Sequence, residues 1–114
     1  MNTTSVGRIG EDIACKYLTV NGYEIIKRNY RAAHGEIDVI AQRGAHLAFV
    51  EVKTRYNADF GHASEAVNYK KQQRIKSAAR VFLTSYSKYE DISFDVCEVY
   101  TSKRTINYIE AAFE

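Results

Sequence analysis

The chain has 114 residues, 46% of them hydrophobic and 26% charged, with a formal net charge of +2 at pH 7. This length and composition are typical of one globular domain, residues 1–114, and the net charge is too small to indicate nucleic-acid binding by itself. There is no apolar stretch long enough for a membrane span and the first residues are polar, so we expect a cytoplasmic protein with no membrane partner.

The first predicted element is a helix over residues 5–21, with Ser5 as its candidate N-cap and Gly22 as its left-handed stop. Glu11 lies at the edge of the apolar arc of this helix. Taken alone, it is typical of a surface Glu near a helix N-terminus, and only the acids described below make it a site candidate. Helical spacing predicts a core face made of Val6, Ile9, Ile13, Tyr17 and Val20.

The middle of the chain is predicted to form strands. A first strand covers residues 23–29 and ends near Asn29. Residues 35–55 then form two apolar runs around Gly44, and this pattern predicts a β-hairpin. The hairpin sequence is GEIDVIAQRGAHLAFVEVKTR.

Both runs of the hairpin carry acids where a buried strand should have none. Asp38 interrupts the first run, and Glu51 and Lys53 interrupt the second. Strand alternation puts Glu51 and Lys53 on one face, about 7 Å apart, and pairing of the runs brings Asp38 near Glu51. Two carboxylates in an apolar sheet repel each other unless a cation or proton lies between them, so the pattern indicates a divalent-metal site. Glu36 shares a strand face with Asp38, and either the edge of this site or a contact with an Arg explains it.

A polar loop over residues 54–63 precedes a long predicted helix over residues 64–87, with Ser64 as its candidate cap. Its core face is predicted to consist of Ile75, Ala78, Ala79, Phe82 and Tyr86. Its early turns carry Lys70, Lys71, Arg74, Lys76 and Arg80 with almost no acid. Such a run is often a solvated face, but a phosphodiester substrate needs cations beside an acidic metal site.

Two more strands are predicted over residues 93–100 and 105–109, joined by a polar turn at residues 102–104. The order of elements is therefore α-β-β-β-α-β-β. This order predicts an α/β fold with a mixed central sheet flanked by helices.

Several segments in this order resemble the YraN family of endonuclease-like proteins. They are G(x2)GE(x2)A(x2)YL at residues 7–18, GEID at residues 35–38, FVEVKTR at residues 49–55, a basic helix, FDV, and a terminal AF. That family is similar to archaeal Holliday junction resolvases and to the restriction-endonuclease-like PD-(D/E)XK superfamily. The usual Pro before the motif Asp is replaced by Ile37, there is no QxxxY signature in the second helix, and the last motif reads AAF.

The resemblance implies a magnesium-dependent nuclease site, in which Mn²⁺ can replace Mg²⁺. Asp38 and Glu51 correspond to direct metal ligands, with the Val52 carbonyl as a further one, and Glu11 to the acid of the first helix. Lys53 corresponds to the lysine that orients or deprotonates the attacking water. Alternatively, Lys53 forms a salt bridge with one of the acids.

The function expected from these residues is hydrolysis of DNA phosphodiester bonds, including branched or structured DNA. Lys71 and Arg74 are expected to contact phosphates and Arg55 to guide the strand. Resolvases of this architecture work as homodimers, because two symmetric cuts need two sites. Two alternatives stay open: a catalytically silent nucleic-acid-binding or assembly factor on the same scaffold, and a structural partner protein that uses a Tyr-rich surface.

Overall fold

The computed structural model describes residues 3–57 and 67–114, and side chains from residue 7 onward within them. Over these residues the chain forms a mixed α/β fold with a central sheet and flanking helices, and the predicted order of elements is confirmed. None of the helices in the described ranges is long and apolar enough to cross a membrane. The elements are α1 (Thr3–Val20), β1 (Glu24–Ala32), β2 (Gly35–Arg43), β3 (His46–Arg55), α3 (Tyr69–Leu83), β4 (Asp91–Tyr100) and β5 (Thr105–Phe113).

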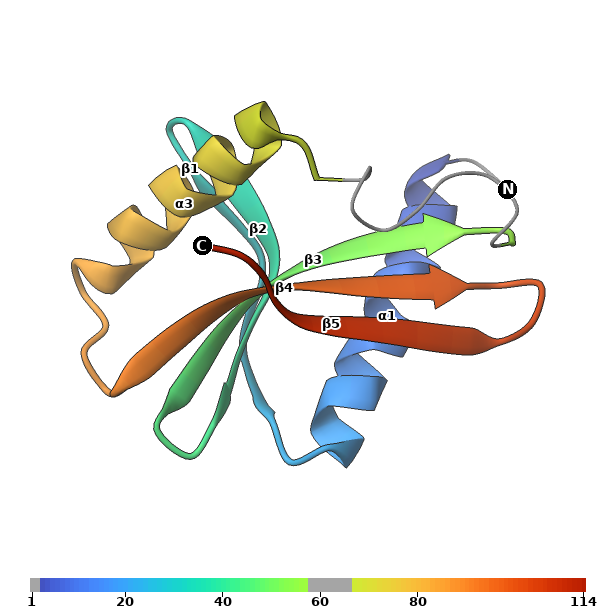
Figure 1. Cartoon of the computed structure of the whole chain (residues 1–114), viewed down its shortest axis with the longest axis horizontal. Helices are drawn as coiled ribbons and strands as arrows, with labels where there is room; N and C mark the ends of the chain where they lie inside the picture. The colour runs from blue at the N-terminus through green and yellow to red at the C-terminus, as the bar shows by residue number, and fades with distance from the viewer. Residues whose placement is uncertain (1–2, 58–66) are drawn as a thin grey trace.

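The five strands form one sheet in the order β1-β2-β3-β4-β5 (Figure 1). β1 to β3 are an antiparallel meander, and Gly44 makes the β2–β3 turn at a positive φ of 59°, as predicted. β4 is parallel to β3, and β5 returns antiparallel to β4. Because parallel neighbours need a crossover, the chain passes over one face of the sheet between β3 and β4, and α3 belongs to this crossover.

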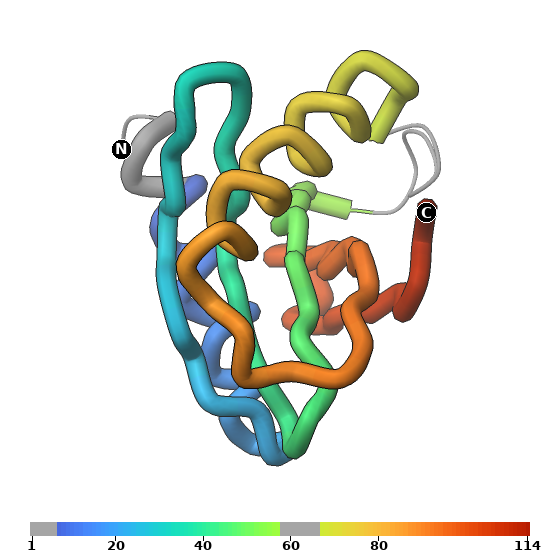
Figure 2. Tube along the Cα trace, turned by 90° about the vertical axis from the view of Figure 1, so that its left-hand side faces the viewer, coloured from blue at the N-terminus to red at the C-terminus, as the bar shows by residue number. Residues whose placement is uncertain are grey.

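α1 and α3 cover opposite faces of the sheet, α3 in front of the strands and α1 behind them in Figure 2. The core under α3 consists of Ile75, Ala78, Ala79 and Phe82, which pack on Ile37, Ile40, Leu47 and Phe49. The core under α1 consists of Ala14 and Leu18, which pack on Val39, Ala41, Ala48 and Val50. The sheet is therefore apolar on both sides, as expected for a central sheet between helices.

The core face predicted for α1 is wrong in three of its residues: Tyr17 does pack against the core as predicted, and the Val6 side chain lies outside the described residues. The buried side chains of α1 are Ala14 and Leu18, whereas Ile9, Ile13 and Val20 are 40%, 36% and 78% exposed. The helix packs through its small residues instead, since Gly10 lies so close to β3 that a Cβ there would be 1.8 Å from the Thr54 hydroxyl oxygen. The close approach of the α1 backbone to β3 therefore decides which face of the helix is buried, in place of burial of its larger apolar side chains. The buried face of α1 adjoins Glu11 as a result.

The predicted start of the second long helix is also wrong. Ser64 lies outside the described residues, and α3 begins at Tyr69 after the N-cap Asn68, whose side chain accepts a hydrogen bond from the Lys71 backbone N–H. Asn is a preferred N-cap because its short side chain reaches the unpaired N–H groups of the first turn. At the other end the helix stops at Leu83, so Tyr86 packs against Phe82 from outside the helix, with ring centroids 5.0 Å apart.

The edge strands are longer than predicted. β1 continues through Asn29, at a φ of 52°, to Ala32, and β5 continues to Phe113. Asn tolerates the left-handed conformation better than most residues, so Asn29 bends the strand without ending it.

α3 touches the backbone of β2 at Gly35, where a Cβ would lie 2.0 Å from the Arg74 carbonyl oxygen. Gly35→Ala should therefore push α3 away from β2 and lower the free energy of unfolding by about 1–3 kcal/mol, as overpacking typically does. Urea denaturation checks this. Gly7→Ala is the matched control, because no atom lies within 4 Å of a Cβ there and the helix should gain up to about 1 kcal/mol. Equal stability of the two variants would contradict the prediction.

Candidate functional site

The site begins where β2 and β3 separate. Their pairing runs from the Gly44 turn as far as Val39 and Val50, and beyond that pair the Val52 N–H donates to Asp38 Oδ2 at 2.8 Å. The Asp38 carboxyl group therefore takes the place of a main-chain acceptor in the gap between the strands. The separation of β2 and β3 at this point leaves a space lined by polar groups within a largely apolar sheet.

Asp38 and Glu51 meet in this space, as the hairpin register predicted. The two carboxyl groups interact electrostatically, and the Glu51 side chain is only 7% exposed. Burial first, and then the negative charge of Glu51, raises the pKa of Asp38 from 3.8 to about 7, although the Val52 N–H opposes the shift. Without a cation, the pair therefore holds a proton up to neutral pH.

Two lysines adjoin this acid pair. Lys71 Nζ on α3 lies 2.5 Å from Glu51 Oε1. Burial opposes the charged form of Lys71, but the hydrogen bond and charge of Glu51 outweigh it and raise the pKa of Lys71. Burial together with the charge of the neighbouring Lys71 lowers the pKa of Lys53. One amine is thus held as a cation, while the other is more easily deprotonated than an ordinary lysine.

Glu11 reaches the same space from α1. Its side chain is 18% exposed, its charge contributes to the raised pKa of Asp38, and its Oε1 lies 3.7 Å from Arg28 Nη2. Arg28 also binds Asp12 more closely, at 2.7 Å. The structure therefore brings Glu11 into the surroundings of the pair, with its charge partly offset by Arg28.

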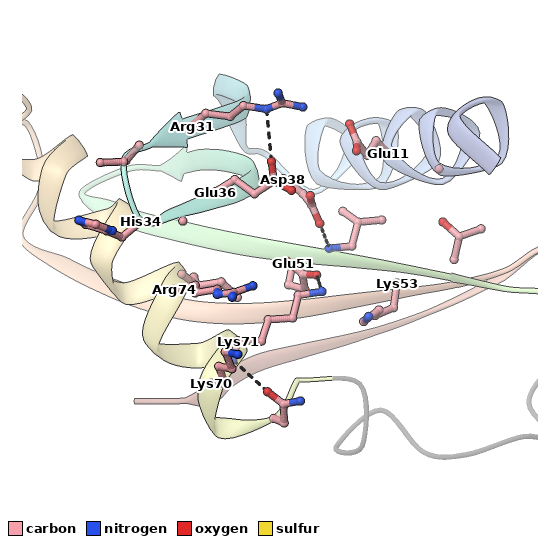
Figure 3. A pocket seen from close by; sticks show the side chains of 18 residues that line it. Glu11, Arg31, His34, Glu36, Asp38, Glu51, Lys53, Lys70, Lys71 and Arg74 are labelled. Carbon is pink, nitrogen blue, oxygen red and sulfur yellow. Dashed lines mark hydrogen bonds and ion pairs between the residues drawn. The ribbon is translucent and has the colours of Figure 1, made fainter.

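A cavity of about 1250 Å³ encloses these groups (Figure 3). It is lined by residues of α1, α3, β1, β2 and β3, and by the turn that joins β1 to β2. Glu36 lies at its rim and forms an ion pair with Arg31 at 3.3 Å, so both explanations offered for Glu36 hold. The charged side chains in the lining are Glu11, Glu36, Asp38, Glu51, Arg31, Lys53, Lys70, Lys71 and Arg74.

Besides Lys53, two cations of the lining form no ion pair with the acids that the structure describes. Lys70 and Arg74 are exposed on α3, and no described carboxylate lies within ion-pair distance of them. Arg55, in contrast, approaches the buried Glu98 at 3.9 Å and is not part of the cavity lining. Its predicted contact with DNA stays a prediction.

The donor set fits a hard divalent cation. Over residues 3–57 and 67–114 no three acidic, His or Cys side chains stand close enough to form a complete metal-binding group. Asp38 and Glu51 nevertheless offer carboxylate oxygens from rigid neighbouring strands, and Mg²⁺ characteristically takes one or two carboxylates and keeps several waters. The raised pKa of Asp38 reflects the unfavourable burial of two neighbouring carboxyl groups, which a bound cation would offset.

The fold and the cavity define an α/β protein with paired carboxylates and lysines at the opening of a mixed sheet. The chain belongs to UPF0102, "Uncharacterised protein family UPF0102", whose family model matches residues 10–99. This confirms the family-level resemblance inferred from GEID and FVEVKTR. The relation to PD-(D/E)XK nucleases stays a prediction.

Relatives from several bacteria match along nearly their whole length, each bearing the name "UPF0102 protein". A protein of Dictyoglomus thermophilum is 44% identical over 104 residues, which cover 90% of this chain and 88% of the relative. A protein of Alkaliphilus oremlandii is 47% identical over 113 residues, which cover 95% and 97%. A solved structure of Pyrococcus furiosus SfsA in complex with Ca²⁺ covers 99% of this chain and 65% of its own, at 18% identity and a TM-score of 0.36, too low to support an inference.

Sequence reasoning placed Lys71 on the phosphates, but the structure has it on Glu51. It also passed over His34 as a site residue, which lines the cavity from the β1–β2 turn. Asn68 is the signal that could have located Lys71: an N-cap at this position places Lys71 in the first turn of α3, beside β3.

Proposed function

We propose that this protein is a divalent-metal-dependent nuclease that hydrolyses phosphodiester bonds in DNA, with branched DNA among its substrates. The observation that supports this best is the pairing of Asp38 with Glu51 in a largely buried gap, next to a lysine with a lowered pKa. Carboxylates in such a place need a cation, and a lowered lysine pKa is what a base near neutral pH requires.

Asp38 and Glu51 would hold Mg²⁺ or Mn²⁺, together with the Val52 main-chain oxygen, and Glu11 would bind it directly or through water. When bound, such an ion polarises the phosphate and lowers the pKa of an attacking water. Lys53 would accept the proton of an attacking water as the water oxygen bonds to phosphorus. The bond from phosphorus to the leaving sugar oxygen would then break, and that oxygen would take up a proton from solvent. A cut on each side of a branch would require two copies of the chain.

The cations of α3 provide the second support. Lys70 and Arg74 line the cavity with no described acidic partner, and they can offset the repulsion between the site acids and a DNA backbone. The Arg74 guanidinium is suited to two hydrogen bonds with one phosphate, whereas Lys70 acts as a point charge.

One observation favours the alternative of a catalytically silent nucleic-acid-binding protein. The ion pair of Lys71 with Glu51 partly neutralises the acids without any metal. In a silent protein this pair would be permanent, and DNA would bind equally well with or without divalent ions. Metal dependence of DNA binding therefore separates the two functions.

The activity is tested with purified protein, Mg²⁺ or Mn²⁺, and a panel of linear, single-stranded, flapped and four-way DNA. We expect cleavage that stops on addition of EDTA and is absent in Asp38→Ala. Asp91→Ala is the matched control, because Asp91 is 71% exposed and forms its ion pair with His46 outside the cavity. Wild-type protein that cleaves none of these substrates, or Asp38→Ala that cleaves as well as wild type, would overturn the proposal.

A further inference from the structure

The ion pair between Lys71 and Glu51 crosses from α3 to β3 inside the cavity. Lys71 Nζ is 2.5 Å from Glu51 Oε1, with side-chain exposures of 38% and 7%. The Lys71 main chain is fixed, because its N–H donates to the Asn68 side chain at 2.9 Å. The pair therefore joins a fixed backbone to a nearly buried acid through a long, flexible side chain (Figure 3).

The ammonium group of Lys71 binds Glu51 Oε1, one of the two oxygens that Glu51 could offer to a metal ion. It supplies the positive charge that two neighbouring carboxyl groups require, and Asp38 and Lys53 both lie within its electrostatic reach. A divalent cation carries twice that charge and binds carboxylate oxygens directly, so it competes with Lys71 for the same acceptor. In the metal-free protein, the ammonium group of Lys71 therefore supplies the positive charge that a bound ion would otherwise supply.

If the ammonium group of Lys71 leaves Glu51, it joins two other cations of α3 in the cavity. Lys70 and Arg74 lie on the same helix and line the same cavity, and neither has an acidic partner in the described part of the chain. Together the three cations would form a positively charged patch on α3, beside the acids. A phosphate diester entering the cavity would then meet three free cations on α3, where the metal-free protein offers two on this helix.

We propose that Lys71 is an exchangeable counter-ion: a divalent ion bound at Asp38 and Glu51 displaces its ammonium group, which then binds a phosphate of the nucleic acid. This rests on the proposed function and deepens it. Metal binding and DNA binding then strengthen each other, because coupling between two sites is reciprocal. The metal-free protein, with Lys71 held by Glu51, is the form with low affinity for DNA.

The first test compares wild type with Lys71→Met and with the control Lys70→Met, using calorimetric titration with Mn²⁺ alone. Lys71→Met should bind Mn²⁺ about tenfold more tightly than wild type, since a competing charge is gone, whereas Lys70→Met should match wild type. Equal or weaker Mn²⁺ binding by Lys71→Met would overturn the exchange but not the nuclease. Absence of Mn²⁺ binding in all three proteins would overturn the proposed function itself.

The second test measures DNA binding with a phosphorothioate duplex that resists hydrolysis, by fluorescence anisotropy with and without Mn²⁺. In wild type, Mn²⁺ should tighten DNA binding about tenfold, and in Lys71→Met this gain should fall several-fold. Lys70→Met should weaken binding in both conditions and keep the gain. An unchanged gain in Lys71→Met would overturn the exchange.

A structural readout covers the case in which Lys71→Met fails to fold, as judged by circular dichroism. In wild-type protein, the side-chain NMR resonance of Lys71 should shift on addition of Mg²⁺ alone, as its amine leaves Glu51. The Lys70 resonance serves as the internal control and should not move comparably. A Lys71 resonance that stays in place while Mg²⁺ binds would overturn the exchange.

Discussion

Replacement of Lys53 by Met is expected to slow DNA cleavage by about 100- to 10,000-fold, the usual contribution of a general base, while Mn²⁺ binding is retained. Lys53 lies two residues from Glu51, and burial and the charge of Lys71 lower its pKa. Met keeps the length of the side chain without the amine, so the loss reports on the proton acceptor. Single-turnover cleavage at saturating metal measures the effect.

Lys103→Met is the matched control, because Lys103 is exposed in the turn between β4 and β5 and should leave cleavage unchanged. The informative comparison is between the effect of Lys53→Met on the cleavage rate and its effect on Mn²⁺ affinity. If Lys53→Met lost Mn²⁺ affinity and cleavage together, Lys53 would be a support of the metal site and not the base. Full activity of Lys53→Met would remove the assigned role altogether.

The second large effect concerns the pH dependence of stability without divalent ions. The pKa of Asp38 is raised from 3.8 to about 7 in the folded protein, mainly by burial and then by Glu51. Below about pH 4, both the folded and unfolded chains carry the proton, and the contribution of this group is fully present. As the pH rises toward 7, the unfolded chain releases the proton first, so the folded state loses stability.

Asp38→Asn cannot titrate, so its advantage over wild type in free energy of unfolding should grow between pH 4 and pH 8. Each pKa unit corresponds to about 1.4 kcal/mol, so we expect a gain on the order of a few kcal/mol. Urea denaturation at several pH values gives this difference, and Asp12→Asn, which removes an exposed acid of α1, is the control. A difference that stays constant with pH would contradict the raised pKa of Asp38.

The hairpin could be predicted because its signals are local. Gly44 marked the turn, and a turn together with strand alternation fixes which residues face each other, so Asp38 and Glu51 were placed together correctly. The separation of the strands beyond Val39 and Val50 had no such signal, since it depends on a side-chain acceptor replacing a main-chain one. The acid pair was therefore predictable, but the gap that holds it was not.

The α1 face and the buried acids of β4 depend on tertiary packing. Large apolar residues indicate the buried face of a helix only when the helix packs on the sheet at the usual distance. Gly10 lets α1 approach β3 more closely than that. Asp95 is completely buried, and its carboxyl group is satisfied there by hydrogen bonds donated by Tyr108 Oη–H and the Ala111 N–H, at 2.5 and 2.9 Å. Both donors lie on β5, so the sequence of β4 alone does not predict that Asp95 is buried.

The crossover between β3 and β4 separates the acids of the cavity from its α3 cations along the chain. Glu11, Asp38 and Glu51 all precede it, whereas Lys70, Lys71 and Arg74 lie on α3, within it. During synthesis, the meander can therefore form from neighbouring segments while the balancing charges are still unmade. A chain that ends before α3 presents these carboxylates without the α3 cations, so we expect it to repel a polyanion until α3 is in place.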